Sequence, residues 1–119
     1  MKNFSESPNF VNLASATVEG NALSVNDTSI TVGSGVRYIE VSATDYIYQG
    51  SQNHYLSIFK NGVNAGGITQ FITTNWNTLN ISGFIIPVST GDTIQFQVTG
   101  DPGYYATVTE FYASVKAIH

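Results

Sequence analysis

Three β-like runs separated by turns dominate the middle of the sequence: YLSIFKNGV at 55–63, LNISGFIIPV at 79–88 and TGDTIQFQV at 90–98. Asn61-Gly62 lies between two apolar runs, and both residues tolerate positive φ, which a two-residue type I′ turn needs at both central positions. Gly91-Asp92 precedes an alternating strand. We expect Ile94, Phe96 and Val98 to point to one side of it, with the polar residues between them on the other.

The chain has 119 residues, which is the size of a single domain with one continuous core. Hydrophobic residues make up 42%, aromatic residues 13% and charged residues only 10%, against about 25% charged in an average globular protein. A surface with so few charges is typical of a protein that buries part of its surface in an interface with a partner or with another copy of itself.

The charge pattern argues against nucleic-acid and membrane partners. The net charge is −4, and the four permanent cations are scattered along the chain as Lys2, Arg37, Lys60 and Lys116. The sequence therefore has no cluster of basic residues that could bind the phosphates of a nucleic acid or anionic lipids. The absence of cysteine excludes disulfides and thiol chemistry. No apolar run is long enough to span a bilayer, and no secretory signal opens the sequence.

Two long strands flank the central runs. Val36 to Tyr48 is the first, and its predicted core face alternates with a mixed aromatic and polar face. The core face carries Ile39, Val41, Ala43 and Ile47; the other carries Tyr38, Glu40, Ser42, Thr44 and Tyr46. Ala106 to Ile118 is the last and has apolar residues on both sides, which indicates a central position in a sheet.

Shorter elements complete the pattern. We expect a strand at 29–32 after a turn at Asn26-Asp27, and an interruption at Ala65-Gly66-Gly67 before a strand around 68–73. No amphipathic helical window appears. The sequence therefore predicts an all-β, antiparallel β-sandwich of about eight to ten strands.

The order of these features resembles the trimeric jelly-roll superfamily of the tumour-necrosis-factor and complement globular-head type. It is most similar to the bacterial and bacteriophage branch, found in phage fibres, head-decoration proteins and spore-filament tips. The resemblance rests on the strand from Val36, the LSIFKNG run at 56–62, the alternating strand at 79–84 and the VSTGDTIQF run at 88–96. Unlike spore-filament and complement heads, no collagen-like Gly-X-Y stalk precedes the domain.

The resemblance implies a jelly-roll domain at 24–119 that forms a homotrimer, preceded at 1–23 by an arm or short first strands that attach to other virion proteins. Aromatic residues in excess of the needs of a small core favour the same assembly. The predicted trimer-interface residues are Tyr38, Tyr46, Tyr55, Phe59, Tyr105 and Tyr112. Alternatively, these rings lie at the sandwich margin with their hydroxyls in water.

Catalytic groups are few. We expect His54, which borders a strand after a polar loop, to be a surface residue. No Gly-x-Ser-x-Gly motif is present, and turn positions explain Asp27, Asp92 and Asp101 without catalysis. We predict no enzymatic activity, no metal and no cofactor.

One group of loop residues has the chemistry of a sugar-binding platform, because aromatic rings flanked by amides stack on and hydrogen-bond to sugars. These residues are Trp76, Asn75, Asn77 and Tyr104, with Tyr105 beside the last. A core position for Trp76 is the alternative.

The sequence thus predicts a non-enzymatic bacteriophage virion structural protein, either a head decoration or head fibre or a fibre or baseplate component. It would be made in the host cytoplasm without a signal peptide and would reside on the particle surface. The alternative is a receptor- or glycan-binding tip module of a phage fibre or a bacterial surface filament, with a host surface glycan as the partner.

Overall fold

The computed structural model describes residues 2–3, 10–13, 17–19, 22–48, 52–72, 76–100 and 107–119. All elements in these ranges are strands: β1 (Lys2–Asn3), β2 (Thr17–Glu19), β3 (Leu23–Asn26), β4 (Ser29–Val32), β5 (Tyr38–Tyr48), β6 (Gln52–Lys60), β7 (Val63–Ile72), β8 (Trp76–Pro87), β9 (Thr93–Gly100) and β10 (Thr107–Ile118). The all-β prediction is confirmed for this part of the chain.

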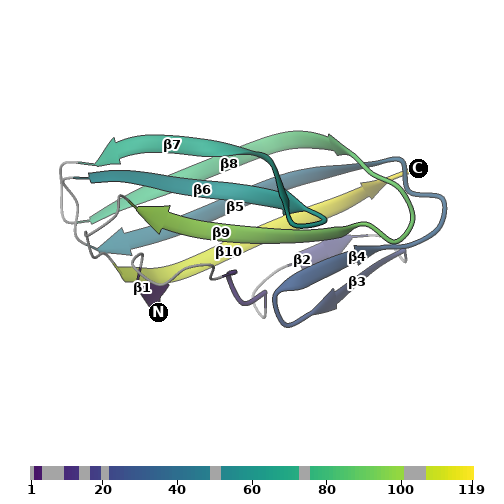
Figure 1. Ribbon diagram of the computed structural model, residues 1–119, viewed down its shortest axis with the longest axis horizontal. Helices are drawn as coiled ribbons and strands as arrows, with labels where there is room; N and C mark the ends of the chain where they lie inside the picture. The colour runs from purple at the N-terminus through teal and green to yellow at the C-terminus, as the bar shows by residue number, and fades with distance from the viewer. Residues whose placement is uncertain are drawn as a thin grey trace.

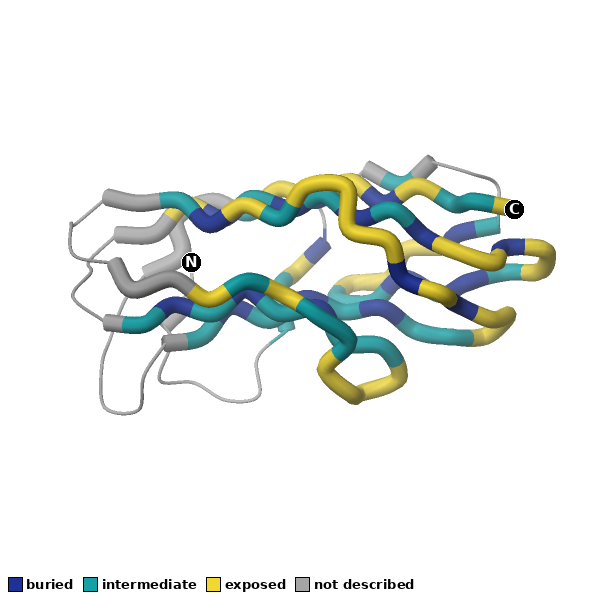
Figure 2. The backbone as a smooth tube through the Cα atoms, turned by 90° about the horizontal axis from the view of Figure 1, so that it is seen from above, coloured by how far each residue is buried: buried dark blue, intermediate teal, exposed yellow. Residues whose placement is uncertain are grey.

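The strands form two sheets that pack face to face (Figure 1). The first sheet has the order β1-β10-β5-β8, with β2 also paired to β10, and the second sheet has the order β3-β4-β9-β6-β7. Pairing is antiparallel throughout except between β2 and β10. Seen from above, the sheets are two layers whose buried positions alternate along the strands (Figure 2). The predicted antiparallel β-sandwich is therefore confirmed.

The chain alternates between the two sheets. From β4 onward, every connection passes from one sheet to the other, apart from the β6–β7 hairpin. As a result β10, the last of these strands in the sequence, lies inside the first sheet with neighbours on both sides. This agrees with the central position predicted for it.

The two predicted turns form as expected. Asn61 and Gly62, between β6 and β7, have φ of 55° and 81°, so the type I′ requirement for positive φ at both positions is met. Gly91, with φ of 90°, precedes β9. Within β9, Ile94, Phe96 and Val98 are fully buried, as the alternation predicts.

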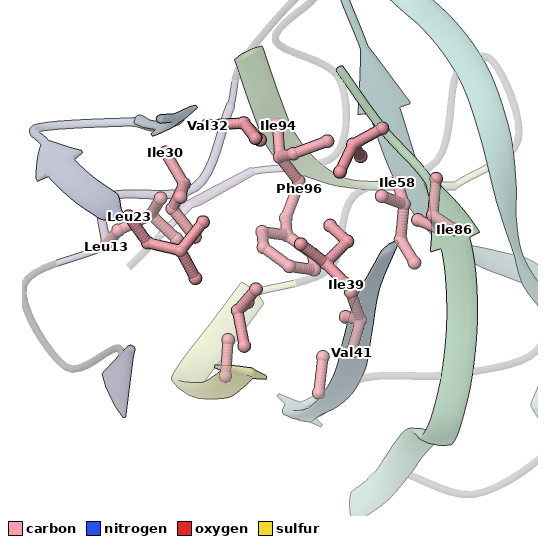
Figure 3. Close-up of a cluster of buried hydrophobic side chains, with 14 of the residues drawn as sticks. Leu13, Leu23, Ile30, Val32, Ile39, Val41, Ile58, Ile86, Ile94 and Phe96 are labelled. Atoms are coloured by element: carbon pink, nitrogen blue, oxygen red, sulfur yellow. The ribbon is translucent and has the colours of Figure 1, made fainter. Parts of the chain in front are cut away.

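The core lies between the sheets. Figure 3 shows Phe96 and Ile58 of the second sheet pointing toward Ile39 and Val41 of the first. The ring of Phe96 also packs on that of Phe111, with the centroids 5.6 Å apart. Burying side chains of this size contributes about 1.5–3 kcal/mol each.

Part of the predicted N-terminal arm belongs to this sandwich. Val11 N donates to Phe96 O at 2.8 Å, and Leu13 N donates to Asp27 O at 2.7 Å. Leu13 is itself a core residue with 2% of its surface exposed. The predicted boundary between residues 23 and 24 falls inside β3.

The interruption predicted at residues 65–67 is wrong. β7 runs through it, and the pairing with β6 shifts register between Ile58 and Phe59. This irregularity accommodates the local glycines without ending the strand, as a β-bulge does.

Candidate functional site

The outer face of the first sheet carries three exposed tyrosines. Tyr38 and Tyr46 on β5 and Tyr112 on β10 are 45%, 39% and 48% exposed. They occupy outward positions because Ile39, Val41, Ala113 and Val115 fill the inward ones. The rings of Tyr46 and Tyr112 meet edge to face, with centroids 6.1 Å apart. We call Tyr38, Tyr46 and Tyr112, together with Ile85 on β8, the tyrosine face.

Charges on this face are few and opposed. Glu40 on β5 is paired in register with Lys116 on β10, and Ser42 is paired with Ser114. Ile85, 46% exposed, is the β8 partner of Glu40. The face thus carries tyrosines toward both ends and the opposed pair Glu40 and Lys116 between them, and Glu110 is the β10 register partner of Tyr46.

The other predicted interface residues lie elsewhere. Tyr55 and Phe59 occupy the outward, half-buried positions of β6, on the outer face of the second sheet. There the ring of Phe59 packs edge to face on that of Phe10, 5.4 Å between centroids. The structure thus separates Tyr55 and Phe59 from Tyr38, Tyr46 and Tyr112 by the thickness of the sandwich. Tyr105 lies outside the described residues.

The edge strands β7 and β8 have an unusual composition. No charged side chain occurs between Lys60 and Asp92, the stretch that supplies both strands. Val63 and Phe84 within it are 69% and 37% exposed. Exposed edges in natural proteins are normally protected by charges, especially lysine. This signal is visible in the sequence and adds an uncharged edge to the tyrosine face.

The two edges are joined by a close contact. Phe84 of β8 lies over Gly66 of β7, where a Cβ atom would come within 2.5 Å of the ring. Only glycine leaves this space free, and the φ of 152° at Gly66 also disfavours other residues. The ring of Phe84 therefore closes the sandwich between its two uncharged edges.

Asp45 is a buried carboxyl group that the sequence pattern did not reveal. It follows Ile39, Val41 and Ala43 on the inward face of β5 and is fully buried. Its Oδ1 accepts a hydrogen bond from Leu79 N at 3.1 Å, and its Oδ2 has no hydrogen-bond partner. Burial raises the pKa of Asp45 from 3.8 to about 7, although the bond from Leu79 lowers it.

The surface position predicted for His54 is wrong. His54 lies within β6 and is fully buried, two and four residues before the core residues Leu56 and Ile58. Alternate residues of a strand face the same side, so the even spacing of His54 from Leu56 and Ile58 is the signal that would have placed its side chain between the sheets. Asp45 and His54 come from different sheets, and both point into the sandwich.

The remaining acidic group of interest lies in a turn. Asp92 accepts hydrogen bonds from Asn61 Nδ2 at 2.9 Å and from Ser89 N at 2.8 Å. These two bonds, with a smaller contribution from Lys60, hold its pKa below 3.8. Among the described residues, no three acidic, histidine or cysteine side chains lie close enough together to hold a metal ion.

The predicted sugar-binding residues are only partly placed. Trp76 and Asn77 begin β8, where their backbones pair with Tyr48 and Ile47, instead of lying in a loop. Their side chains lie outside the described part of the structure, as do all atoms of Asn75 and Tyr104. The sugar-binding prediction for these four residues remains a prediction.

Comparisons with known proteins identify no family. No protein-family model matches the sequence, and a search of curated proteins gives no significant match. A search of solved structures returns a family 35 carbohydrate binding module from an environmental isolate. It has a TM-score of 0.34 and 16% identity, over 92% of this chain and 93% of the other. Among the described residues, no helix has the length and apolar character needed to cross a membrane.

Proposed function

We propose that the protein is a non-enzymatic structural subunit that assembles as a homotrimer on the surface of a virion. The observation that carries the proposal is the tyrosine face, on which Tyr38, Tyr46, Tyr112 and Ile85 are each 39–48% exposed on one sheet. Covering one such ring contributes roughly 2–3 kcal/mol by area, before the cost of association.

The strand order supports a jelly roll as the finer description of the sandwich. Jelly rolls place eight strands in two sheets by repeated crossing between them. Here each sheet has four such strands, β2, β10, β5 and β8 in one and β4, β9, β6 and β7 in the other, with β1 and β3 as additional strands, and from β4 onward the chain crosses between the sheets at every connection except the β6–β7 hairpin. The placement on a virion rests on the sequence resemblance to bacteriophage proteins.

A contact in which the sheet edge of one protomer packs on the sheet face of the next is compatible with a closed ring of three protomers. In this arrangement, the uncharged β7–β8 edge of one protomer covers the tyrosine face of the next. Such a contact joins two different patches, and it closes without free ends when the rotation between protomers is one third of a turn. It also covers the edges that carry no protective charge.

Attachment to the rest of the virion is assigned to residues 1–23. Within this arm, Val11 and Leu13 are hydrogen-bonded to the sandwich, and β1 and β2 pair with β10. Attachment through the arm must therefore preserve these bonds.

Light scattering coupled to gel filtration tests the assembly. We expect the full chain to have three times the mass of one chain at micromolar concentration. Tyr112→Ala combined with Ile85→Lys is expected to give monomers, because it removes a ring and adds a charge to the tyrosine face. Tyr55→Ala on the opposite outer face is the matched control and is expected to stay trimeric.

Two outcomes would overturn the proposal. A monomeric full chain would exclude the trimer. A trimer that survives the Tyr112 and Ile85 changes but is lost with Tyr55→Ala would move the contact to the other sheet. Circular dichroism of each variant establishes that the strands are retained.

A second candidate function, glycan binding, is favoured by the outer face of the second sheet. The described outward positions of β6 and β9 are uncharged: Asn53, Tyr55, Ser57, Phe59, Thr93, Gln95, Gln97 and Thr99. Rings, hydroxyls and amides together suit neutral sugars. Calorimetry with neutral oligosaccharides tests it, since Phe59→Ala should weaken binding while Tyr112→Ala should not. If Trp76→Ala alone abolishes binding, the sugar binds at the start of β8 instead.

A further inference from the structure

Asn61-Gly62 combines a reactive sequence with an unusually restrained side chain. Asn61 is the one asparagine in the sequence that is followed by glycine. Glycine leaves the following backbone nitrogen sterically open, so an Asn-Gly pair is the arrangement in which that nitrogen most easily attacks the asparagine side chain. The same two residues form the turn between β6 and β7, and Asn61 is exposed.

The side chain of Asn61 is held at both ends. Its Nδ2 donates to Asp92 Oδ1 at 2.9 Å, and its Oδ1 accepts from Thr93 N at 2.9 Å. The backbone adds a third link, because Asn61 N donates to Thr93 O at 2.9 Å. The carboxamide therefore ties the β6–β7 turn to the beginning of β9.

These bonds oppose the geometry that the reaction needs. For attack, the carboxamide of Asn61 must turn its carbon toward the backbone nitrogen of Gly62, which requires both side-chain bonds to break. The bond to Asp92 is the stronger of the two, since hydrogen bonds to a charged acceptor are worth about twice those between neutral groups.

We propose that Asn61 is a site of spontaneous deamidation that the folded turn keeps unreactive, with the Asp92 carboxylate as the group that restrains it. The backbone nitrogen of Gly62 loses its proton and bonds to Cγ of Asn61, the Cγ–Nδ2 bond breaks, and Nδ2 takes up a proton and leaves as ammonia. Water then opens the resulting cyclic imide at either carbonyl, which gives aspartate or isoaspartate at position 61.

The product cannot restore the original contacts. A carboxylate at position 61 has no N–H to donate to Asp92, so two negative charges face each other where a hydrogen bond stood. Lys60, whose Nζ donates to Pro87 O at 3.1 Å, is the nearby cation and offsets this only in part. Isoaspartate also lengthens the backbone within a two-residue turn. Deamidation therefore removes the side-chain bond from the β6–β7 turn to Asp92 and replaces it with a repulsion between two carboxylates.

Peptide mapping by mass spectrometry after incubation of the full chain at pH 8 tests the proposal. We expect slow conversion of Asn61 in the native protein and much faster conversion in concentrated urea. Asp92→Ala is expected to raise the native rate about tenfold, in line with the loss of one charged hydrogen bond. Asp92→Asn keeps an acceptor oxygen for Asn61 and is expected to lie between Asp92→Ala and the wild type.

A core variant separates local release from general unfolding. Val115→Ala creates a cavity in the core at β10, where Val115 is fully buried and pairs with Val41 of β5, so it lowers stability without removing a bond of Asn61. At equal measured stability, Asp92→Ala should convert faster than Val115→Ala. Equal rates in these two variants would overturn the role of Asp92, and equal rates in native and urea-treated wild type would overturn protection by the fold.

Discussion

Asp45 and Asp92 carry the same side chain in opposite surroundings. Asp45 lies between the sheets and accepts one hydrogen bond, from Leu79 N, whereas Asp92 lies in a solvated turn and accepts bonds from Asn61 and Ser89. The pKa of Asp45 rises to about 7, and that of Asp92 falls. The difference shows that a single donor does not offset the loss of water around a carboxylate, while two donors at the surface stabilise the charge.

The largest expected effect is the pH dependence caused by Asp45. Between pH 4 and 7 the native protein keeps a proton that the unfolded chain has lost, so stability falls as pH rises through this range and levels off above it. The rise in pKa from 3.8 to about 7 corresponds to roughly 4 kcal/mol. Urea unfolding of the wild type and of Asp45→Asn at several pH values measures this pH-dependent part of the free energy of unfolding.

Asp45→Asn should remove this dependence, because the amide keeps an oxygen for Leu79 N and does not ionise. We expect the variant to be more stable than the wild type at pH 8, and this advantage to disappear at pH 4. An identical pH profile in both proteins would show that Asp45 is ionised, and satisfied, in the native state.

Asp92→Ala is expected to change the free energy of unfolding by less than the Asp45 effect. Its pH dependence is the reverse, because the contribution of Asp92 is lost as pH falls. Loss of the bonds to Asn61 and Ser89 should cost about 1–2 kcal/mol near pH 7, after allowance for solvent screening. The folded pKa of Asp92 is lowered, so its contribution is present above about pH 4 and is lost as pH falls through the folded pKa. Unfolding of the wild type and Asp92→Ala should therefore converge in acid, and a difference that persists at pH 2 would contradict this.

Asn61→Asp places a fixed negative charge opposite Asp92. We expect a loss of about 1 kcal/mol at low ionic strength that shrinks in 1 M salt, because exposed charges are screened. Asn80→Asp is the control: it adds the same charge on β8, yet its oxygen can still accept the bond from Thr44 Oγ1, which is 2.6 Å long in the wild type. A similar loss in both variants would mean that charge alone, and not the Asp92 contact, is responsible.

The smallest expected effect is that of Lys60→Met. Lys60 makes the weakest contribution to the low pKa of Asp92, so this pKa should rise slightly in the variant. The stability change should stay under about 0.5 kcal/mol, apart from the lost bond to Pro87 O. NMR titration of the Asp92 carboxyl carbon measures the shift, and a fall in this pKa would contradict the expectation.

The contrast between the two carboxyl groups also explains what the sequence could predict. The turn at Asn61-Gly62 and the alternation in β9 depend on neighbouring residues only, and both were predictable. Asp45 and His54 occupy positions whose strand parity points inward, but an ionisable residue type argues for the surface. Burial was decided by the opposite sheet, which local patterns do not describe.

The tyrosines illustrate the same limit at a larger scale. Parity predicts that Tyr38 and Tyr46 share one side of β5, and the structure agrees. It does not predict that Tyr55 and Phe59 face away from them, because that depends on which sheet each strand joins. The contact of Phe84 with Gly66 likewise joins strands of different sheets.

The position of β10 has a consequence for synthesis of the chain. The second sheet is complete once β9 has been made, but the first sheet lacks its inner strand until β10 follows. During synthesis, β5 therefore has one unpaired edge until β10 has been made. Long-range strand pairing slows folding, and unpaired edges favour association between nascent chains. The first sheet, which carries the tyrosine face, is thus completed only after β10 has been made.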